Sequence, residues 1–424
     1  MIYYQKVSET SVLDKQDLEE GVVIALDKWG KSKKVLAIPP DFTRFHSFAG
    51  ILTQMADRYL RNRLTDILPA LGTHAAMTAH EINAMYKGLD ISKFRIHKWR
   101  EDVITIGEVP QEYVKNISGG IISYSWPAQL NKLLINGGYD LILSIGQVVP
   151  HEVAGMASYN KNIFIGTGGK ESINKSHFLG AAYGMEKMMG RANTPVRKVL
   201  NYASENFASD LPVLYILTVV SEDEKGNLGI RGLFIGDDEQ CFHKASQLSL
   251  KVNFNMLDKP LKKVIVYLNP DEYKSTWLGN KSIYRTRMAL ADGGELIVLA
   301  PGVRVFGEDR EIDRLIRIYG YANTPKILKW VEQNEDLKDN LSAAAHLIHG
   351  SSEDRFTITY CPGFLSKEEI ENIYFKYADP VKMMKKYNPA RLNNGFNMMP
   401  DGEEIYYISN PALGLWAYKE RFRH

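Results

Sequence analysis

Cysteine and long apolar segments are scarce in this sequence. The chain has 424 residues but only 2 cysteines, Cys241 and Cys361, which lie too far apart for a disulfide framework or a zinc motif. No apolar run approaches the ~20 residues of a membrane-spanning helix. The polar N-terminal residues do not resemble a cleavable signal peptide. We therefore expect a cytoplasmic protein without a membrane partner.

A strong charge of one sign is also missing. The 52 lysines and arginines nearly balance the 50 aspartates and glutamates, which leaves a formal net charge of +2. This balance gives no general reason to expect nucleic acid or an anionic surface as a partner. The length exceeds that of one typical domain, so we expect two domains. A homo-oligomer is compatible with this composition and stays open.

Apolar runs alternate with helical patterns in the first part of the chain. Short apolar runs bounded by glycine, proline or polar residues are typical of buried strands, and their alternation with helices predicts a parallel, doubly wound sheet. Thr78, with Glu81 three residues later, has the spacing of a helix-capping box. The expected strands are 35–38, 66–71, 94–97, 141–145, 213–220 and 229–235, and the expected helices are 48–60, one from 78, 130–134, 195–209 and 237–257. Residues 221–227, with an acidic trio at 222–224, are expected to form a solvated turn.

The segment Leu257-Asp-Lys-Pro260 interrupts the helical pattern, and the α/β rhythm then restarts. The expected strands of the second half are 263–268, 295–300, 356–360 and 404–408, and its helices are 282–290, 310–319 and 325–333. We predict an N-terminal domain of residues 1–258, completed by about 403–424, and a C-terminal α/β domain of residues 259–402. Two Rossmann-like α/β domains with mostly parallel sheets would have an active-site cleft between them.

Chemically active residues cluster in the segment 149–177, which follows the strand expected at 141–145. His151, Lys161 and His177 lie in it, together with several glycines. In open α/β sheets ligands bind beyond the C-terminal ends of strands. A single histidine or lysine is more often structural or solvated, and Lys170 is followed by glutamate rather than by the Ser/Thr of a phosphate loop. The segment indicates a site but does not define its chemistry.

Two other expected strand ends carry polar residues. Asp41-Phe-Thr-Arg44 follows the strand at 35–38, and Gly72-Thr-His74 follows the strand at 66–71. The carboxyl ends of parallel strands meet at the same edge of a sheet. We therefore expect one group of side chains close together at this edge, formed by Asp41, Thr43, Arg44, His74 and His151.

In their order and spacing these motifs resemble the nickel-dependent lactate racemases and related 2-hydroxyacid racemases and epimerases. Asp41-Phe-Thr-Arg44 resembles the D-H-T-R loop of that family, and Gly72-Thr-His74 resembles its G-F-H loop. The segment 150–155 followed by Lys161 resembles S-H-F-F-A-G followed by the family's cofactor-linked lysine. His177 falls at the family's offset from His151. The likeness covers most of residues 35–240.

The resemblance implies a cofactor and its attachment. The family's cofactor is a nickel-pincer nucleotide, a pyridinium mononucleotide whose ring carbon and two sulfurs hold nickel. By resemblance, Lys161 would bind it covalently and His177 would supply the fourth nickel ligand, a role that suits imidazole. The nucleotide phosphate would lie near Asp41, Thr43 and Arg44, because an arginine fork matches phosphate geometry. The enzymes that synthesise this cofactor are then implied partners.

The resemblance also implies a reaction. His74 and His151 would be the acid/base pair on either side of a 2-hydroxyacid, which loses a hydride from C2 and regains it on the opposite face. Removal of the hydroxyl proton must accompany departure of the hydride, and histidine titrates near neutrality. The hydride chemistry belongs to the cofactor, while the protein orients it.

The second half of the chain departs from the family. Where the lactate enzymes have Q-A-V-K at the substrate, this chain has Arg285-Thr-Arg-Met288, and we take Arg285 and Met288 as candidate substrate residues. We therefore expect a substrate other than lactate, such as a sugar acid of the gluconate or mannonate type. Arg285 and Arg287 could both bind a carboxylate, but residues two apart on the helix expected here cannot face one way, so at least one should be solvated. His346 and His349 are expected on a polar helix face.

Two alternatives belong to other classes of protein. One is a zinc hydrolase or lyase with His74, His151 and His177 around the metal, although no ligand pair has the close spacing of common zinc motifs. The other is a non-catalytic nucleotide-binding protein, because a fold does not determine a function.

Overall fold

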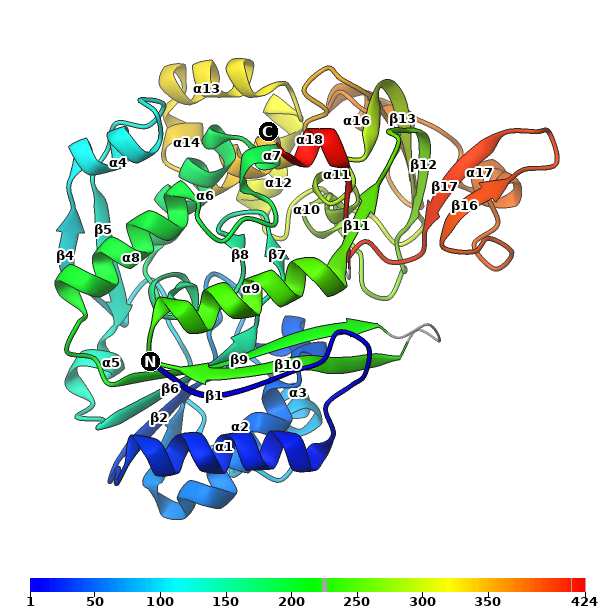
Figure 1. The fold of residues 1–424 in the computed structure, drawn as a ribbon. Coiled ribbons are helices and arrows are strands. Elements are labelled where there is room, and N and C mark those ends of the chain that lie inside the picture. Colours follow the sequence, from blue (N-terminus) through cyan, green and yellow to red (C-terminus); the bar gives the residue numbers. More distant parts are fainter. Residues whose placement is uncertain (223–226, 413, 424) are drawn as a thin grey trace. The chain divides into compact units, whose positions relative to one another are not determined.

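The computed structural model describes residues 1–222, 227–412 and 414–423 (Figure 1). The chain forms two compact units: unit 1 contains Met1–Leu179 and Met189–Asn253, and unit 2 contains Gly180–Met188 and Phe254–His424. The division falls after Asn253 rather than after residue 258, because β11 (Phe254–Leu257) pairs in parallel with β18 (Leu415–Tyr418). The segment 403–424, which we expected to complete the first domain, belongs to unit 2 for the same reason.

Unit 1 is built on a six-stranded sheet of order β1-β10-β9-β6-β2-β3. The neighbours from β9 to β3 pair in parallel, and β10 and β1 add an antiparallel edge. The predicted α/β class with a mostly parallel sheet is thus confirmed. The β9–β10 hairpin is also present, but residues 223–226 of its expected turn lie outside the described residues. The strands are β1 (Ile2–Val7), β2 (Val35–Ile38), β3 (Leu64–Ile67), β6 (Leu141–Gln147), β9 (Val213–Glu222) and β10 (Leu228–Gly236).

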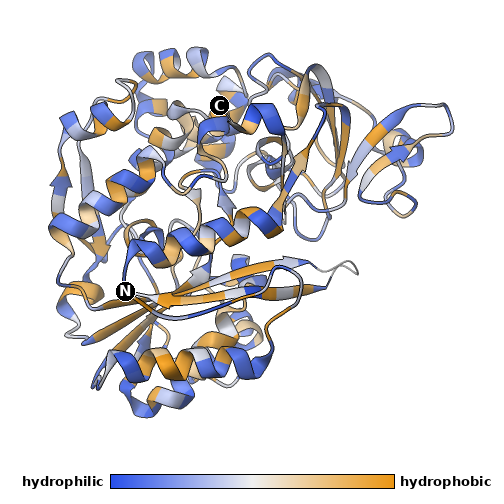
Figure 2. Ribbon diagram, in the orientation of Figure 1, coloured by the Kyte–Doolittle hydropathy of each residue, from blue (hydrophilic) through white to orange (hydrophobic). Residues whose placement is uncertain are grey.

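Burial of aliphatic strands between helices forms the core of unit 1. Every residue of β2 is buried, which fits a central parallel strand covered on both faces. Figure 2 shows this apolar character as orange strands beside helices with polar outer faces. The helices are α1 (Lys15–Trp29), α2 (Ala49–Leu60), α3 (Ala79–Met85), α4 (Gln111–Ile117), α5 (Lys132–Asn136), α6 (Lys170–Tyr183), which continues into unit 2, α8 (Pro195–Phe207) and α9 (Glu239–Asn253).

Three expected elements of unit 1 differ in the structure. Residues 94–97 form no strand, and only Phe94 makes an isolated bridge, to Ile67. Residues 130–134 are divided between β5 (Trp126–Asn131), which pairs with β4 (Val103–Val109), and the short helix α5. The helix expected over 237–257 ends at Asn253, because the next residues form β11. In the last two places strand pairing overrode local propensity.

Unit 2 has its own six-stranded sheet of order β15-β14-β13-β12-β17-β16, parallel except for the edge strand β16. No helix in the described part of the chain combines the length and apolar character needed to span a membrane. The sheet's strands are β12 (Leu261–Tyr267), β13 (Leu290–Ala300), β14 (Thr357–Pro362), β15 (Lys376–Tyr377), β16 (Gly395–Met398) and β17 (Glu404–Ile408). The helices are α7 (Met185–Met188), α10 (Thr276–Gly279), α11 (Lys281–Tyr284), α12 (Arg310–Tyr319), α13 (Thr324–Gln333), α14 (Glu335–Lys338), α15 (Leu341–His349), α16 (Lys367–Asn372), α17 (Pro380–Lys386) and α18 (Lys419–Arg423).

Two predictions about exposure in unit 2 were wrong. The helix expected over 282–290 ends at Tyr284, so Arg285 and Arg287 lie in a turn, and each is only 3% exposed. Because they lie in a turn, their spacing of two residues does not place them on different faces of a helix. His346 and His349 are each 4% exposed rather than on a polar face, because α15 is buried from Ala343 onward.

The capping box predicted at Thr78 is present and offers a test of local stability. The Thr78 hydroxyl accepts from the Glu81 backbone N–H at 3.2 Å, and the Glu81 carboxylate accepts from the Thr78 backbone N–H at 2.7 Å. Thr78→Ala should lower the free energy of unfolding of unit 1 by about 1 kcal/mol, the usual cost of losing an N-cap. Urea unfolding measures it, with the exposed Thr73→Ala in a turn as the control. Equal stabilities of the two variants would contradict the role of the cap.

Candidate active site

The polar motifs of unit 1 follow the ends of three adjacent strands. Asp41 comes after β2, His74 after β3 and His151 after β6, and these strands are neighbours in the order β6-β2-β3. Both pairings are between parallel strands, so the following loops leave the same edge of the sheet. The backbone N–H of Gly72 donates to the carbonyl of Gly166 at 2.8 Å, which joins the loop before His74 to the segment after Lys161.

Asp41 and His74 form a hydrogen-bonded pair. His74 Nδ1 lies 2.6 Å from Asp41 Oδ2, and Thr43 Oγ1 donates to the other carboxylate oxygen at 2.5 Å. Burial raises the pKa of Asp41, but the hydrogen bonds from His74 and Thr43 and the charges of His74 and Arg44 outweigh it and hold that pKa below its usual value. The carboxylate thus stays ionised and keeps the proton of His74 on Nδ1. The His74 side chain is 54% exposed, and the lone pair of its neutral ring lies on Nε2.

In His151 the Nδ1 atom accepts a hydrogen bond, whereas in His74 it donates one. His151 lies in the β7–β8 hairpin (Pro150–His151 with Gly155–Met156), where its Nδ1 accepts from the Val153 backbone N–H at 3.1 Å. The neutral ring therefore carries its proton on Nε2. Burial lowers the pKa of His151 well below its usual value, and the charges of Lys161, Arg44 and His177 lower it further against the opposing effect of Glu152. His151 is uncharged at neutral pH.

Lys161 presents an amine of reduced basicity. It precedes a single π-helical turn, Asn162–Gly166, a feature frequent at functional sites. Burial lowers the pKa of Lys161 to about 8, and the positive charges of Arg44 and Arg197 add to this effect, while Glu152 and Asp41 oppose it. A substantial fraction of the amine is therefore neutral, and thus nucleophilic, just above neutral pH.

The loop before Lys161 is strained and tightly held. Ser158 and Tyr159 have φ values of +67° and +60°, in the left-handed region that such residues rarely adopt. Arg197, on α8, donates to the carbonyl of Met156 at 2.8 Å and to the side-chain oxygen of Asn160. A Cβ added at Gly146 of β6 would meet the Ser158 hydroxyl at 2.4 Å, so a larger residue there would displace the Ser158 side chain. Arg197 was not predicted as a site residue, because it lies outside the sequence motifs.

His177 lies on α6 with one ring nitrogen already occupied. Its Nδ1 donates to the carbonyl of Ile173 at 2.7 Å, which leaves the lone pair of Nε2 available. Burial lowers the pKa of His177 to about 4, with contributions from the charges of Lys161 and His74. A neutral imidazole oriented by a carbonyl is the usual form of a histidine metal ligand.

Several of these side chains are close enough for their charges to change one another's pKa values. His151 and His177 each respond to the charge of Lys161, and Lys161 responds to Arg44 and Asp41. Among the described residues, no three His, Cys, Asp or Glu side chains form a group that could hold a metal ion, which is the arrangement that the zinc alternative requires. Unit 1 brings together Asp41, Thr43, Arg44, His74, His151, Lys161 and His177.

The two candidate substrate residues belong to unit 2. Arg285 Nη1 donates to the carbonyl of Gly414 at 3.2 Å, and the Arg285 carbonyl accepts from the Trp416 N–H. Met288 is fully buried and forms a bridge with Ala417. Both residues thus take part in the packing of the C-terminal segment of unit 2.

Comparison with known proteins gives a family match for part of the chain and a fold for nearly all of it. Residues 23–189 match the lactate racemase N-terminal domain family. The structure is similar to a crystal structure of a protein from Thermotoga maritima, with a TM-score of 0.80 and 24% identity, over 96% of this chain and 99% of that chain. It is also similar to the lactate racemase apoprotein from Thermoanaerobacterium thermosaccharolyticum, with a TM-score of 0.65 and 19% identity, over 97% and 93%. At these identities the structural similarity establishes the fold alone. No curated protein sequence matches the chain.

The lowered pKa of Lys161 can be measured by chemical modification. Acetylation of Lys161 should rise with pH through a midpoint near 8, because only the neutral amine reacts, whereas an ordinary lysine has a pKa of about 10.4. Arg44→Met removes a positive charge and should move the midpoint upward. Peptide mass spectrometry across pH 6–11 follows the reaction. A wild-type midpoint in the ordinary range would contradict the burial of the amine.

Proposed function

Because residues 23–189 match the lactate racemase N-terminal domain family, we propose that this chain is a racemase or epimerase that inverts C2 of a 2-hydroxyacid. The proposal is supported by the Asp41–His74 pair and by the hydrogen bond from Gly72 to Gly166, which joins the loop before His74 to the segment after Lys161. The family match supports the isomerase class in general. We further propose a cofactor, a substrate class and roles for individual residues.

The residues of unit 1 fit a nickel-pincer nucleotide. Lys161 would bind it through a covalent bond at Nζ, and the partly neutral amine supports that role. His177 would supply a nickel ligand through Nε2, whose lone pair is free of the hydrogen bond that Nδ1 makes to Ile173. A cofactor that holds nickel largely by its own atoms would need one protein ligand, a role for which His177 is proposed.

The phosphate of the nucleotide would lie near the 41–44 loop. Arg44 provides the positive charge for it, and Thr43 lies beside it in the same loop. The Asp41 carboxylate is engaged by His74 and Thr43, and a second anion beside it is unfavourable. Within the proposal, Asp41 therefore serves the cofactor loop by ordering Thr43 and orienting His74 rather than by contacting phosphate.

The two histidines would handle the hydroxyl proton. When bound, the cofactor supplies the site that accepts and returns the hydride. His74, oriented by Asp41, has an Nε2 that can take the hydroxyl proton as the hydride leaves C2. His151 has a protonated Nε2 that can donate a hydrogen bond to a substrate oxygen. In the other direction His151 would take the hydroxyl proton, which requires a deprotonated Nε2 and loss of the hydrogen bond from the Val153 N–H to Nδ1.

The substrate of the proposal is a 2-hydroxyacid other than lactate. Arg285 and Met288 replace the glutamine and lysine of the lactate enzymes, so this part of the substrate site differs in charge and shape. A sugar acid such as gluconate or mannonate, whose extra hydroxyl groups need polar partners, is the class we favour. The remaining alternative is a non-catalytic nucleotide-binding protein, which would bind the cofactor without inverting any hydroxyacid.

Covalent loading is the first test of the proposal. When the protein is produced together with the cofactor-synthesis enzymes, its intact mass should exceed that of the bare chain, and peptide mapping should place the addition on Lys161. Lys161→Arg keeps the positive charge but cannot form the bond, so it should remain unmodified. The nearby exposed Lys170→Arg is the matched control and should be loaded like the wild type. A bare wild-type mass under these conditions would contradict the proposal.

Loss of either histidine should abolish most turnover without unfolding the protein. His74→Ala and His151→Ala should each lower kcat by roughly 10²–10⁴, the usual contribution of a general acid or base. His80→Ala, an exposed histidine on α3, is the matched control and should keep full activity. A panel of C2-deuterated hydroxyacids, followed for inversion by the loaded protein, measures the effect. Retained epimerisation in His151→Ala would remove that residue from the mechanism.

A further inference from the structure

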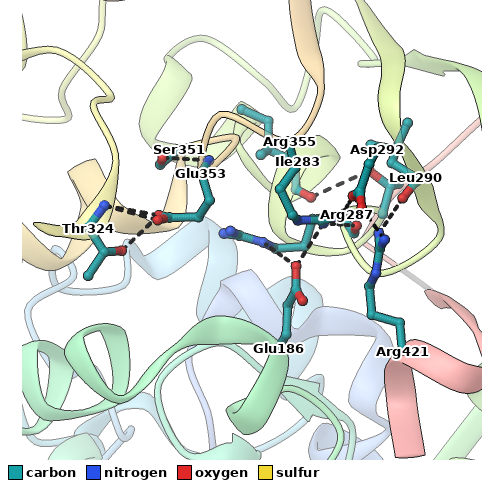
Figure 3. Close-up of polar contacts among 11 residues, drawn as sticks. Glu186, Ile283, Arg287, Leu290, Asp292, Thr324, Ser351, Glu353, Arg355 and Arg421 are labelled. Atoms are coloured by element: carbon teal, nitrogen blue, oxygen red, sulfur yellow. Dashed lines mark hydrogen bonds and ion pairs between the residues drawn. The ribbon is translucent and has the colours of Figure 1, made fainter. Parts of the chain in front are cut away.

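Unit 2 contains a group of ion pairs in which arginines share carboxylates (Figure 3). Arg355 donates to Glu186 and to Asp292, each at 2.8 Å, and Arg421 donates to Asp292 at 3.0 Å. Glu186 also lies 3.5 Å from the Nε of Arg287. The Glu186 carboxylate thus serves two guanidinium groups.

Arg287 is the deeply buried member of this group. It is 3% exposed, and within the described residues its Nε and Nη1 atoms have no hydrogen-bond partner. The contact of Nε with Glu186 is an ion pair without hydrogen-bond geometry. Buried donors are nearly always satisfied, and leaving them unsatisfied is unfavourable. The Nη1 atom of Arg287 therefore lacks an acceptor that packing alone would be expected to supply.

The nearby Glu353 does not provide that acceptor. Its carboxylate accepts from the Thr324 backbone N–H at 3.0 Å and from the Thr324 hydroxyl at 2.7 Å. The turn that carries it is strained, since Glu353 and Asp354 have φ values of +52° and +56°. A hydrogen bond from the Glu353 N–H to Ser351 Oγ, 2.9 Å long, helps to hold this turn. Glu353 acts on Arg287 only through its charge.

The neighbouring carboxylates compensate the burial of Arg287 only in part. Burial lowers the pKa of Arg287, and the charge of Arg355 adds to this effect, while Glu186 and Glu353 oppose it. A bound carboxylate would raise the pKa of Arg287, as Glu186 does, and would offset the lowering caused by burial. The side chains that pair around Arg287 are partly exposed, Glu186 to 30% and Arg355 to 21%.

We propose that Arg287 forms a carboxylate-binding subsite in unit 2 for a small organic acid. The planar guanidinium group matches a carboxylate better than a single ammonium charge does, and the Nη1 atom provides the donor. Glu186 and Arg355 position the guanidinium group. That the acid is a 2-hydroxyacid rests on the proposed function, whereas carboxylate binding by Arg287 does not.

The test uses the full chain without cofactor and glycolate as the probe. Calorimetry should show glycolate binding, and thermal unfolding should shift upward with glycolate relative to chloride at the same ionic strength. Ethylene glycol, which lacks the carboxylate, should do neither. Arg287→Met should weaken glycolate binding at least tenfold. Arg287→Lys keeps the positive charge but lacks the planar guanidinium group, so it should bind glycolate with intermediate affinity. This variant takes the place of Arg287→Met if Arg287→Met does not fold.

Two control variants separate this subsite from other positive groups. Arg421→Met removes a charge from the same ion-pair group but leaves Arg287 in place, so it should bind glycolate like the wild type. Arg44→Met tests the cationic group of unit 1. Wild-type protein that distinguishes glycolate from chloride in neither measurement overturns the proposal, and so does binding that is lost in Arg44→Met but unchanged in the Arg287 variants. Failure of epimerisation alone would reject the proposed function and leave this subsite intact.

Discussion

The candidate active site depends on the burial of basic groups next to one another. Loss of solvation and mutual repulsion lower the pKa values of His151, Lys161 and His177, so the imidazoles are neutral and the amine is partly so. Neutrality is what a metal ligand and a nucleophilic amine require. Asp41 and Glu152 supply the negative charge that limits the repulsion. Burial of these groups is unfavourable for folding, but the same burial makes the imidazoles and the amine reactive in their neutral forms.

The scaffold of unit 1 keeps this arrangement in place. Adjacent parallel strands bring three loops to one edge of the sheet, as the order β6-β2-β3 requires. Arg197 holds the strained segment before Lys161 by its backbone carbonyls, and Gly146 allows that segment to lie against β6. Hydrogen bonding fixes the two catalytic candidates in different tautomers, since Nδ1 is bonded to a carboxylate in His74 and to an N–H group in His151.

Much of the fold was predictable from local patterns, whereas its long-range contacts were not. The strand 35–38, the helix 310–319, the strand 404–408 and the cap at Thr78 follow from apolar periodicity and capping chemistry, and the structure has them. The motifs at strand ends also predicted that polar residues gather. The pairing of His74 with Asp41, the role of Arg197 and the burial of Arg287 depend on partners distant in sequence, which no local pattern encodes. The short helix α11 shows the same limit, because the pairing of β13 ends the helical pattern early.

The discontinuous composition of unit 2 has a consequence for how the chain is made. Gly180–Met188 belongs to unit 2 although the residues on both sides of it in sequence belong to unit 1. During translation this short piece leaves the ribosome long before Arg287 and Arg355, the residues that pair with its Glu186. Unit 2 therefore cannot be completed until nearly the whole polypeptide has emerged. A gene truncated after Asn253 would encode that piece without its native neighbours.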